Sequence, residues 1–229
     1  MNIHAFICTR SKNLGKTTQT LVEYYQDAGI NVSLIVNSKS IFSGYKSAFD
    51  KANPNPDDII ILCHDDIEVL TDKKVFKKLL ISKLQDPKNG FVGVAGTTRL
   101  GETGVWWDIK LWQDQFHSGL VLHGKNIEES DPSFYGKYQE VVAMDGLFLA
   151  ATARTLSRVG LERPNYLKGE WDFYDIHYTI SSHKMGLKNY TVPITLLHNS
   201  SGELVGRDSW HINRKAFLHK YRKDIPITV

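Results

Sequence analysis

The sequence predicts an α/β protein in which a mostly parallel central sheet is flanked by helices within a single domain. Strand-like and helix-like patterns alternate through the first hundred residues, in the order β-α-β-α-β-α-β that is typical of a doubly wound sheet. The third strand pattern, Ile59-Ile60-Ile61-Leu62, is apolar on both faces, as expected of a strand buried between helices. A chain of 229 residues with 41% hydrophobic and 23% charged residues is long enough and apolar enough to form one sizeable core.

The first half of the chain supplies four strand patterns and three helix patterns. Short apolar runs predict strands at residues 3–8, 32–36, 58–63 and 91–95. Apolar residues that share one helical face predict helices at residues 14–25, 45–52 and 71–84. Gly29 ends the first of these helices, and Asp72 can cap the third.

The second half is less regular. Strands are expected at residues 120–122, 140–143 and 190–197, and helices at 154–159 and 172–184. The sequence contains no internal repeat and no linker long enough to divide it. We therefore expect one domain over residues 1–229.

Net charge limits the classes of binding partner that we expect, and cysteine content indicates the cellular compartment. A net charge of +3 is too small to indicate nucleic acid as the main partner. Cys8 and Cys63 each lie in an apolar run, which favours buried free thiols and a cytoplasmic location. The amino terminus lacks the pattern of a signal peptide, and no apolar stretch approaches the ~20 residues of a transmembrane segment. Peripheral membrane contact remains open.

The strand pattern at 58–63 stops abruptly on His64, Asp65 and Asp66. In open α/β sheets, ligands bind beyond the carboxyl ends of the strands. Carboxylates at such a position suit a divalent cation and the phosphates that it carries. Alternatively, these carboxylates cap the following helix or face water.

Four motifs follow one another along the chain, and their order resembles a known family. They are the strand end Ile-Cys-Thr-Arg at 7–10, the segment 43–49 that leads into His64-Asp65-Asp66, the turn Met-Asp-Gly at 144–146, and Trp-Asp-Phe-Tyr-Asp-Ile-His at 171–177 with Pro193 and His198 after it. In this order they resemble the GT-A glycosyltransferases, especially the inverting family 2 type and its streptomycin-biosynthesis-like branch. The resemblance spans roughly residues 3–200. It implies a Rossmann-like GT-A domain with a nucleotide-sugar-binding half (about 1–100) and an acceptor and catalytic half (about 101–229).

The resemblance also implies a donor site. The segment His64-Asp65-Asp66 corresponds to the Asp-x-Asp motif, with histidine at the first carboxylate position. Asp66 is then the best ligand for Mn²⁺ or Mg²⁺, and His198 stands where the family often places a further metal ligand. Thr9, Arg10 and Asn37 end the first two strands and are candidates for nucleotide contacts.

On the acceptor side, the resemblance identifies Asp175 as the general base that removes the proton of the acceptor hydroxyl. Asp172, three residues earlier on the same helix turn, is the rival and a candidate substrate contact. Asp145 and Gly146 correspond to a turn that meets the sugar or the acceptor. Four tryptophans are candidates for an aromatic platform under a sugar ring: Trp106, Trp107, Trp112 and Trp171. Trp106 and Trp171 are the better two, although tryptophans are more often core residues.

The implied activity is metal-assisted transfer of a sugar, hexosyltransferase-type, from a nucleoside-diphosphate-sugar donor to a hydroxyl of a carbohydrate or glycan acceptor. Two other functions remain open. The sequence Gly-Lys-Thr-Thr at 15–18 is part of the phosphate-binding loop of kinases and ATPases, but the full motif needs glycine at position 10, where this chain has Arg10. A noncatalytic carbohydrate-binding module would use the tryptophans and would need neither the acidic strand end nor Asp175.

Overall fold

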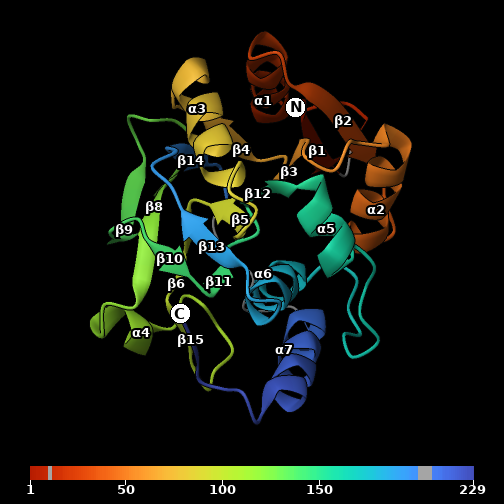
Figure 1. Cartoon of the computed structure of the whole chain (residues 1–229). Helices are drawn as coiled ribbons and strands as arrows, with labels where there is room; N and C mark the ends of the chain where they lie inside the picture. The colour runs from red at the N-terminus through yellow and green to blue at the C-terminus, as the bar shows by residue number, and fades with distance from the viewer. Residues whose placement is uncertain (10–11, 201–207) are drawn as a thin grey trace.

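A mixed seven-stranded sheet, in the order β10-β13-β5-β12-β3-β1-β2, runs through the centre of the computed structural model, which describes residues 1–9, 12–200 and 208–229 (Figure 1). Its strands are β1 (Ile3–Thr9), β2 (Asn31–Val36), β3 (Ile59–His64), β5 (Asn89–Gly93), β10 (Glu140–Val141), β12 (Phe148–Thr152) and β13 (Lys188–Thr191). The five residues 59–63 of β3 are fully buried, as their apolar run predicts.

A second sheet lies beside the first, in the order β11-β6-β8-β14-β4, with β9 paired to β8. Its strands are β4 (Ile67–Val69), β6 (Ala95–Thr97), β8 (His117–His123), β9 (Asp131–Gly136), β11 (Ala143–Met144) and β14 (Leu196–His198). A short pair, β7 (Arg99–Leu100) and β15 (Ile227–Thr228), is antiparallel.

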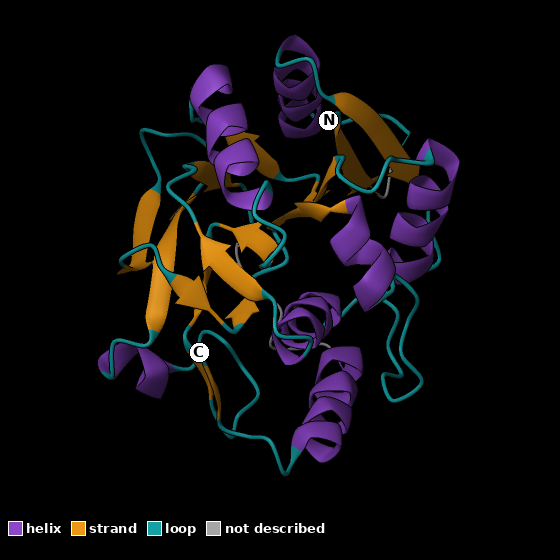
Figure 2. Ribbon diagram, viewed as in Figure 1, coloured by secondary structure: helices purple, strands orange, loops and turns teal. Residues whose placement is uncertain are grey.

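Helices lie around the two sheets (Figure 2). They are α1 (Lys16–Asp27), α2 (Ile41–Ala52), α3 (Lys73–Leu84), α4 (Ile109–Gln113), α5 (Ala153–Val159), α6 (Tyr174–Lys184) and α7 (Asp208–Tyr221). Asp72 caps α3 by accepting hydrogen bonds from the N–H groups of Lys74 and Val75, as predicted. Helix α2 begins earlier than the predicted residue 45, because the Ser40 side chain accepts a hydrogen bond from the Ser43 N–H and caps it.

The α/β fold class is confirmed, but the central sheet is less parallel than predicted. Strands β1, β2 and β3 are parallel neighbours, whereas β12 lies between β3 and β5 and is antiparallel to both. Residues 148–152, which form this strand, were not predicted to be a strand. Its first three residues, Phe148, Leu149 and Ala150, are fully buried, so the missed strand occupies the middle of the core.

The single strand predicted at 190–197 is two strands in different sheets, β13 and β14. Pro193 lies between them, and proline lacks the N–H that a central strand position needs. The chain therefore leaves the first sheet at this residue and enters the second at Leu196. As a result, His198 lies at the end of β14, close to the end of β3.

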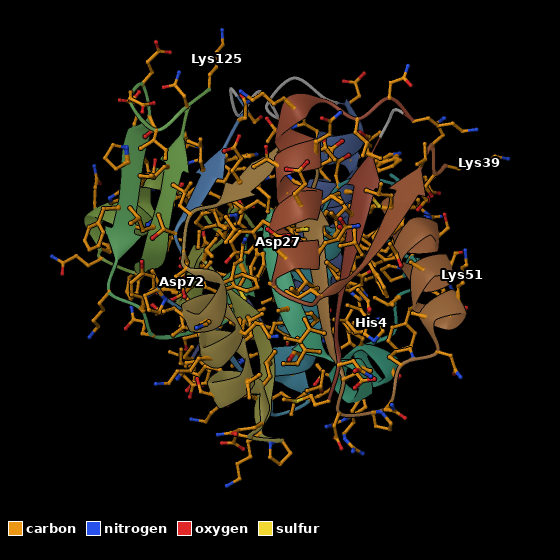
Figure 3. The ribbon with its side chains drawn as sticks, turned by 90° about the horizontal axis from the view of Figure 1, so that it is seen from above. His4, Asp27, Lys39, Lys51, Asp72 and Lys125 are labelled. Carbon is orange, nitrogen blue, oxygen red and sulfur yellow. The ribbon has the colours of Figure 1, made fainter. Side chains whose placement is uncertain are left out.

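Surface charge is spread over the molecule. Figure 3 shows Lys39, Lys51 and Lys125 at the periphery, with their side chains pointing outward in different directions. Both cysteines are free, as predicted: Cys63 is buried and Cys8 is half-buried. Within the described part of the chain, no helix combines the length and the apolar character that crossing a bilayer requires.

Candidate active site

A cavity of about 630 Å³ opens where the two sheets meet. The ends of β1 and β3 line one part of it, together with the start of α1. The turn at 144–146 and the segment 171–176, which leads into α6, line another part. Because β1 and β3 are parallel, their carboxyl ends meet at this edge, with Cys8 paired to His64.

His64, Asp66 and His198 come together at one point of this cavity. The N–H of Asn199 donates to the Asp66 carbonyl at 2.8 Å, and His198 is paired with Ile67 across the two strands β14 and β4. The Asp66 Oδ1 atom lies 3.7 Å from His64 Nδ1 and 3.5 Å from His198 Nε2. One ligand atom from each residue falls within 4.8 Å of the others. The structure therefore brings His64 beside the two residues predicted to bind a metal.

The three residues of this cluster shift one another's pKa values: burial acts to lower the pKa of His198, but the adjacent Asp66 carboxylate outweighs it and the pKa is raised. Burial acts to raise the pKa of Asp66, but the two neighbouring imidazoles outweigh it and the pKa is lowered. Burial also lowers the pKa of His64, which favours its neutral form, the form that can coordinate a metal. Within the described residues, Asp66 Oδ1 is buried and receives no hydrogen bond. A carboxylate oxygen between two imidazole nitrogens fits a divalent ion such as Mn²⁺.

Asp175 lies in the first turn of α6, on the wall of the same cavity. Its carboxylate accepts hydrogen bonds from the backbone N–H groups of Gly146, at 3.0 Å, and Ile176, at 2.8 Å. Burial and the nearby Asp145 carboxylate raise the pKa of Asp175 to about 7, although the two N–H donors oppose the shift. A carboxyl group with this pKa is suited to general-base chemistry near neutral pH.

Gly146 holds the turn at 144–146 against α6. A Cβ atom at this position would lie 2.3 Å from the Tyr174 hydroxyl oxygen and 3.0 Å from Asp175 Cβ. The first of these distances is impossible without displacing the tyrosine, so the close backbone approach that the sequence suggested requires glycine. Asp145 forms the rest of the turn and accepts a hydrogen bond from the Leu147 N–H at 2.8 Å.

Asp172 borders the cavity but has a structural partner. Its side chain is 5% exposed, and its Oδ2 atom accepts a hydrogen bond from the Ser209 hydroxyl at 2.7 Å. Its backbone carbonyl accepts a second bond from the Asn213 side chain at 2.9 Å. Asp172 therefore holds α7 against the cavity.

The tryptophans correct one prediction. Trp171 is 38% exposed and lines the cavity, whereas Trp106 is 2% exposed, does not line it and packs against His117 and Tyr135. Its neighbour Trp107 lines the cavity instead, with its ring centroid 6.0 Å from that of Trp210. The sequence places two tryptophans side by side but does not determine which one is turned toward the core.

The predicted nucleotide contacts are only partly brought together. Thr9 lines the cavity, whereas Asn37 is exposed outside it and donates its N–H to the Thr9 carbonyl. Arg10 lies outside the described residues. The Gly-Lys-Thr-Thr sequence at 15–18 also lines the cavity, where the Thr18 hydroxyl donates to the Asp65 carbonyl at 2.9 Å. The motif therefore lies at the wall of the cavity.

Comparison with known proteins agrees with this architecture. GalNAc-T7, solved with UDP, GalNAc and Mn²⁺, is 12% identical with a TM-score of 0.58; the match covers 96% of this chain but only 48% of that protein. A197 from STIV is 14% identical with a TM-score of 0.50, over 88% of this chain and 87% of the other. These likenesses show the GT-A fold alone. No curated protein matches the sequence significantly. A family model described as "Glycosyltransferase like family" matches residues 7–222, so the chain belongs to this glycosyltransferase-like family.

Proposed function

We propose that this glycosyltransferase transfers a hexose, with inversion, from a nucleoside-diphosphate sugar to a hydroxyl of a carbohydrate acceptor. The observation that carries the proposal is that one cavity contains both the His64, Asp66 and His198 cluster and the carboxylate of Asp175. Family membership supports sugar transfer and speaks against both a phosphate-loop kinase and a noncatalytic module. The order of the sequence motifs favours the streptomycin-biosynthesis-type branch.

The donor binds in this proposal at the carboxyl ends of β1 and β3. Asp66, His198 and His64 would hold Mn²⁺ or Mg²⁺, and the ion would supply positive charge to neutralise the leaving diphosphate. The presence of UDP and Mn²⁺ in GalNAc-T7 supports a nucleotide-sugar donor and this ion. Thr9 and Asp65 lie in the cavity on the nucleotide side, and Arg10 and Asn37 remain proposed contacts at its edge.

The acceptor hydroxyl loses its proton to Asp175 as its oxygen bonds to the anomeric carbon, while the bond from that carbon to the diphosphate oxygen breaks. The two backbone N–H groups occupy one acceptor position on each carboxylate oxygen and fix its orientation, which leaves the remaining lone pairs for the hydroxyl. Attack from the side opposite the diphosphate inverts the anomeric carbon. Trp171 and Trp107 offer apolar faces to the acceptor sugar, beside Asp145, Gly146 and Asp172.

The two free thiols support a reducing compartment, which for this proposal is the cytoplasm. The acceptor in this proposal is a carbohydrate or glycan, and contact with a membrane surface would be peripheral.

The rate should depend on pH through Asp175. Only the ionised carboxylate accepts a proton, and its pKa is raised to about 7. We therefore expect kcat/KM to reach a plateau above pH 7 and to fall about tenfold per pH unit well below it. Replacing Asp145 by asparagine removes the neighbouring negative charge, so it should shift the fall to lower pH. An unshifted profile in Asp145→Asn would contradict the assignment of this pKa to Asp175.

Thermal shifts with nucleotides test the proposal as a whole. A ligand that binds only the folded protein raises its stability by RT ln(1 + [L]/Kd). We expect one of the nucleoside diphosphates UDP, GDP or dTDP to raise the Tm in the presence of Mn²⁺, and to do so much less without it; CMP and ATP are the comparison ligands. Stabilisation by ATP alone would overturn the proposal in favour of a phosphate-binding enzyme, and no stabilisation by any nucleotide would also count against it.

A further inference from the structure

The hydroxyl of Tyr174 lies between a metal-site residue and the turn that carries the base. Its oxygen is 3.0 Å from His64 Nε2 and 2.9 Å from the carbonyl oxygen of Gly146. The residue is 4% exposed and packs edge-on against Tyr45 and Phe42, so the ring is held in one place. The motif comparison assigned no role to this residue.

Counting hydrogens determines the direction of both bonds. A carbonyl oxygen only accepts, so the single hydroxyl hydrogen of Tyr174 goes to Gly146. The hydroxyl then offers only a lone pair to His64, and the Nε2 atom must carry the hydrogen. In neutral histidine this leaves Nδ1 with a lone pair, and Nδ1 is the atom that lies 3.7 Å from Asp66 Oδ1.

The opposite arrangement costs free energy. If Tyr174 donated to Nε2, the buried Gly146 carbonyl would lose this bond, at a cost of about 1–3 kcal/mol. The hydrogen of the neutral His64 ring would then be on Nδ1. The Nδ1 atom lies 3.7 Å from Asp66 Oδ1, which is too far for a good compensating hydrogen bond. This hydrogen would also block the nitrogen that faces the metal cluster.

We propose that Tyr174 is a positioning residue that selects the Nε2–H tautomer of His64 and so makes Nδ1 the third ligand atom of the metal site. This inference rests on the metal site of the proposed function. Histidines that bind metals commonly donate their other N–H to a fixed partner, whose loss costs about 10–100-fold in metal affinity. Here the partner is a hydroxyl anchored on Gly146, whose N–H also holds Asp175, so one turn orients both ends of the site.

Tyr174→Phe tests the proposal, because it removes the hydroxyl and keeps the ring. Tyr178→Phe is the matched control: it lies one turn further along α6 and loses a similar bond, from its hydroxyl to the Leu161 carbonyl at 3.0 Å, which does not involve His64. Mn²⁺ affinity would be measured by titration followed by electron paramagnetic resonance of the free ion. The His64 tautomer would be read in the metal-free protein from long-range ¹H–¹⁵N correlations.

We expect Mn²⁺ to bind about 10–100-fold more weakly to Tyr174→Phe and with unchanged affinity to Tyr178→Phe. The wild-type protein should show His64 with hydrogen on Nε2, and Tyr174→Phe should lose this preference. An Nδ1–H tautomer in the wild type would overturn the proposal, even if Tyr174→Phe failed to fold. Equal Mn²⁺ affinities in folded Tyr174→Phe and wild type would also overturn it. A wild type that holds the Nε2–H tautomer but binds no Mn²⁺ would refute the metal site and leave the tautomer selection supported.

Discussion

Replacing Asp175 by asparagine is expected to lower kcat by about 10²–10⁴-fold, the usual contribution of a general base, while the affinity for the donor stays within about twofold. The amide cannot take up the proton of the acceptor hydroxyl, and one of the two backbone N–H groups, of Gly146 or Ile176, loses its acceptor oxygen. Donor binding depends on the other part of the cavity, at the ends of β1 and β3. Single-turnover rates and a donor titration measure the two effects separately.

Asp172→Asn is the matched control for this experiment. It changes the other carboxylate of the same segment, and its remaining oxygen can still accept the hydrogen bond from Ser209. We expect turnover within about fivefold of the wild type, because the Asp172 carboxylate holds α7 in place and does not transfer a proton. If Asp172→Asn lost turnover and Asp175→Asn retained it, the two roles would have to be exchanged.

The first half of the fold could be predicted because its signals are local. The apolar run of β3 and the cap at Asp72 each determine an element from a few neighbouring residues. The position of β12 could not be predicted in this way, because its pairing with β3 joins residues about ninety positions apart and follows no short-range pattern. The insertion of an antiparallel strand into the middle of the sheet depends on long-range tertiary contacts, which the alternation of strand and helix patterns does not reveal.

The residues of the candidate site also differ in whether a local sequence pattern could predict them. The acidic end of β3 can be recognised in the sequence, because charged residues directly follow a buried strand. Tyr174 cannot be recognised in this way, since its partner His64 is 110 residues away and an aromatic residue in a helix resembles an ordinary core residue. The preference for Trp106 over Trp107 was wrong for a further reason: in an irregular segment no periodicity indicates which of two adjacent tryptophans faces the cavity.

The metal cluster also depends on a contact that no local pattern supplies. Asp66 comes from the end of β3, and His198 comes from β14 after the break at Pro193. Their meeting requires β14 to pair with β4, which directly follows Asp66. The Asp66 Oδ1 atom then lies between two imidazoles and, in the described part of the chain, has no hydrogen-bond donor. This oxygen is the group whose loss should affect cation binding most.

Asp66→Ala is therefore expected to weaken Mn²⁺ binding by more than about 10²-fold, since even the outer partners of metal ligands contribute about 10–100-fold. Without the carboxylate, two imidazoles face each other across the site with no negative charge between them. The Mn²⁺-dependent rise in Tm caused by the nucleotide should disappear in this variant as well. Asp65→Ala is the control, because Asp65 is the adjacent carboxylate, lines the cavity and is not part of the cluster. Calorimetric titration of Mn²⁺ into the two variants separates them; equal losses of affinity would mean that bulk negative charge, rather than coordination by Asp66, attracts the ion.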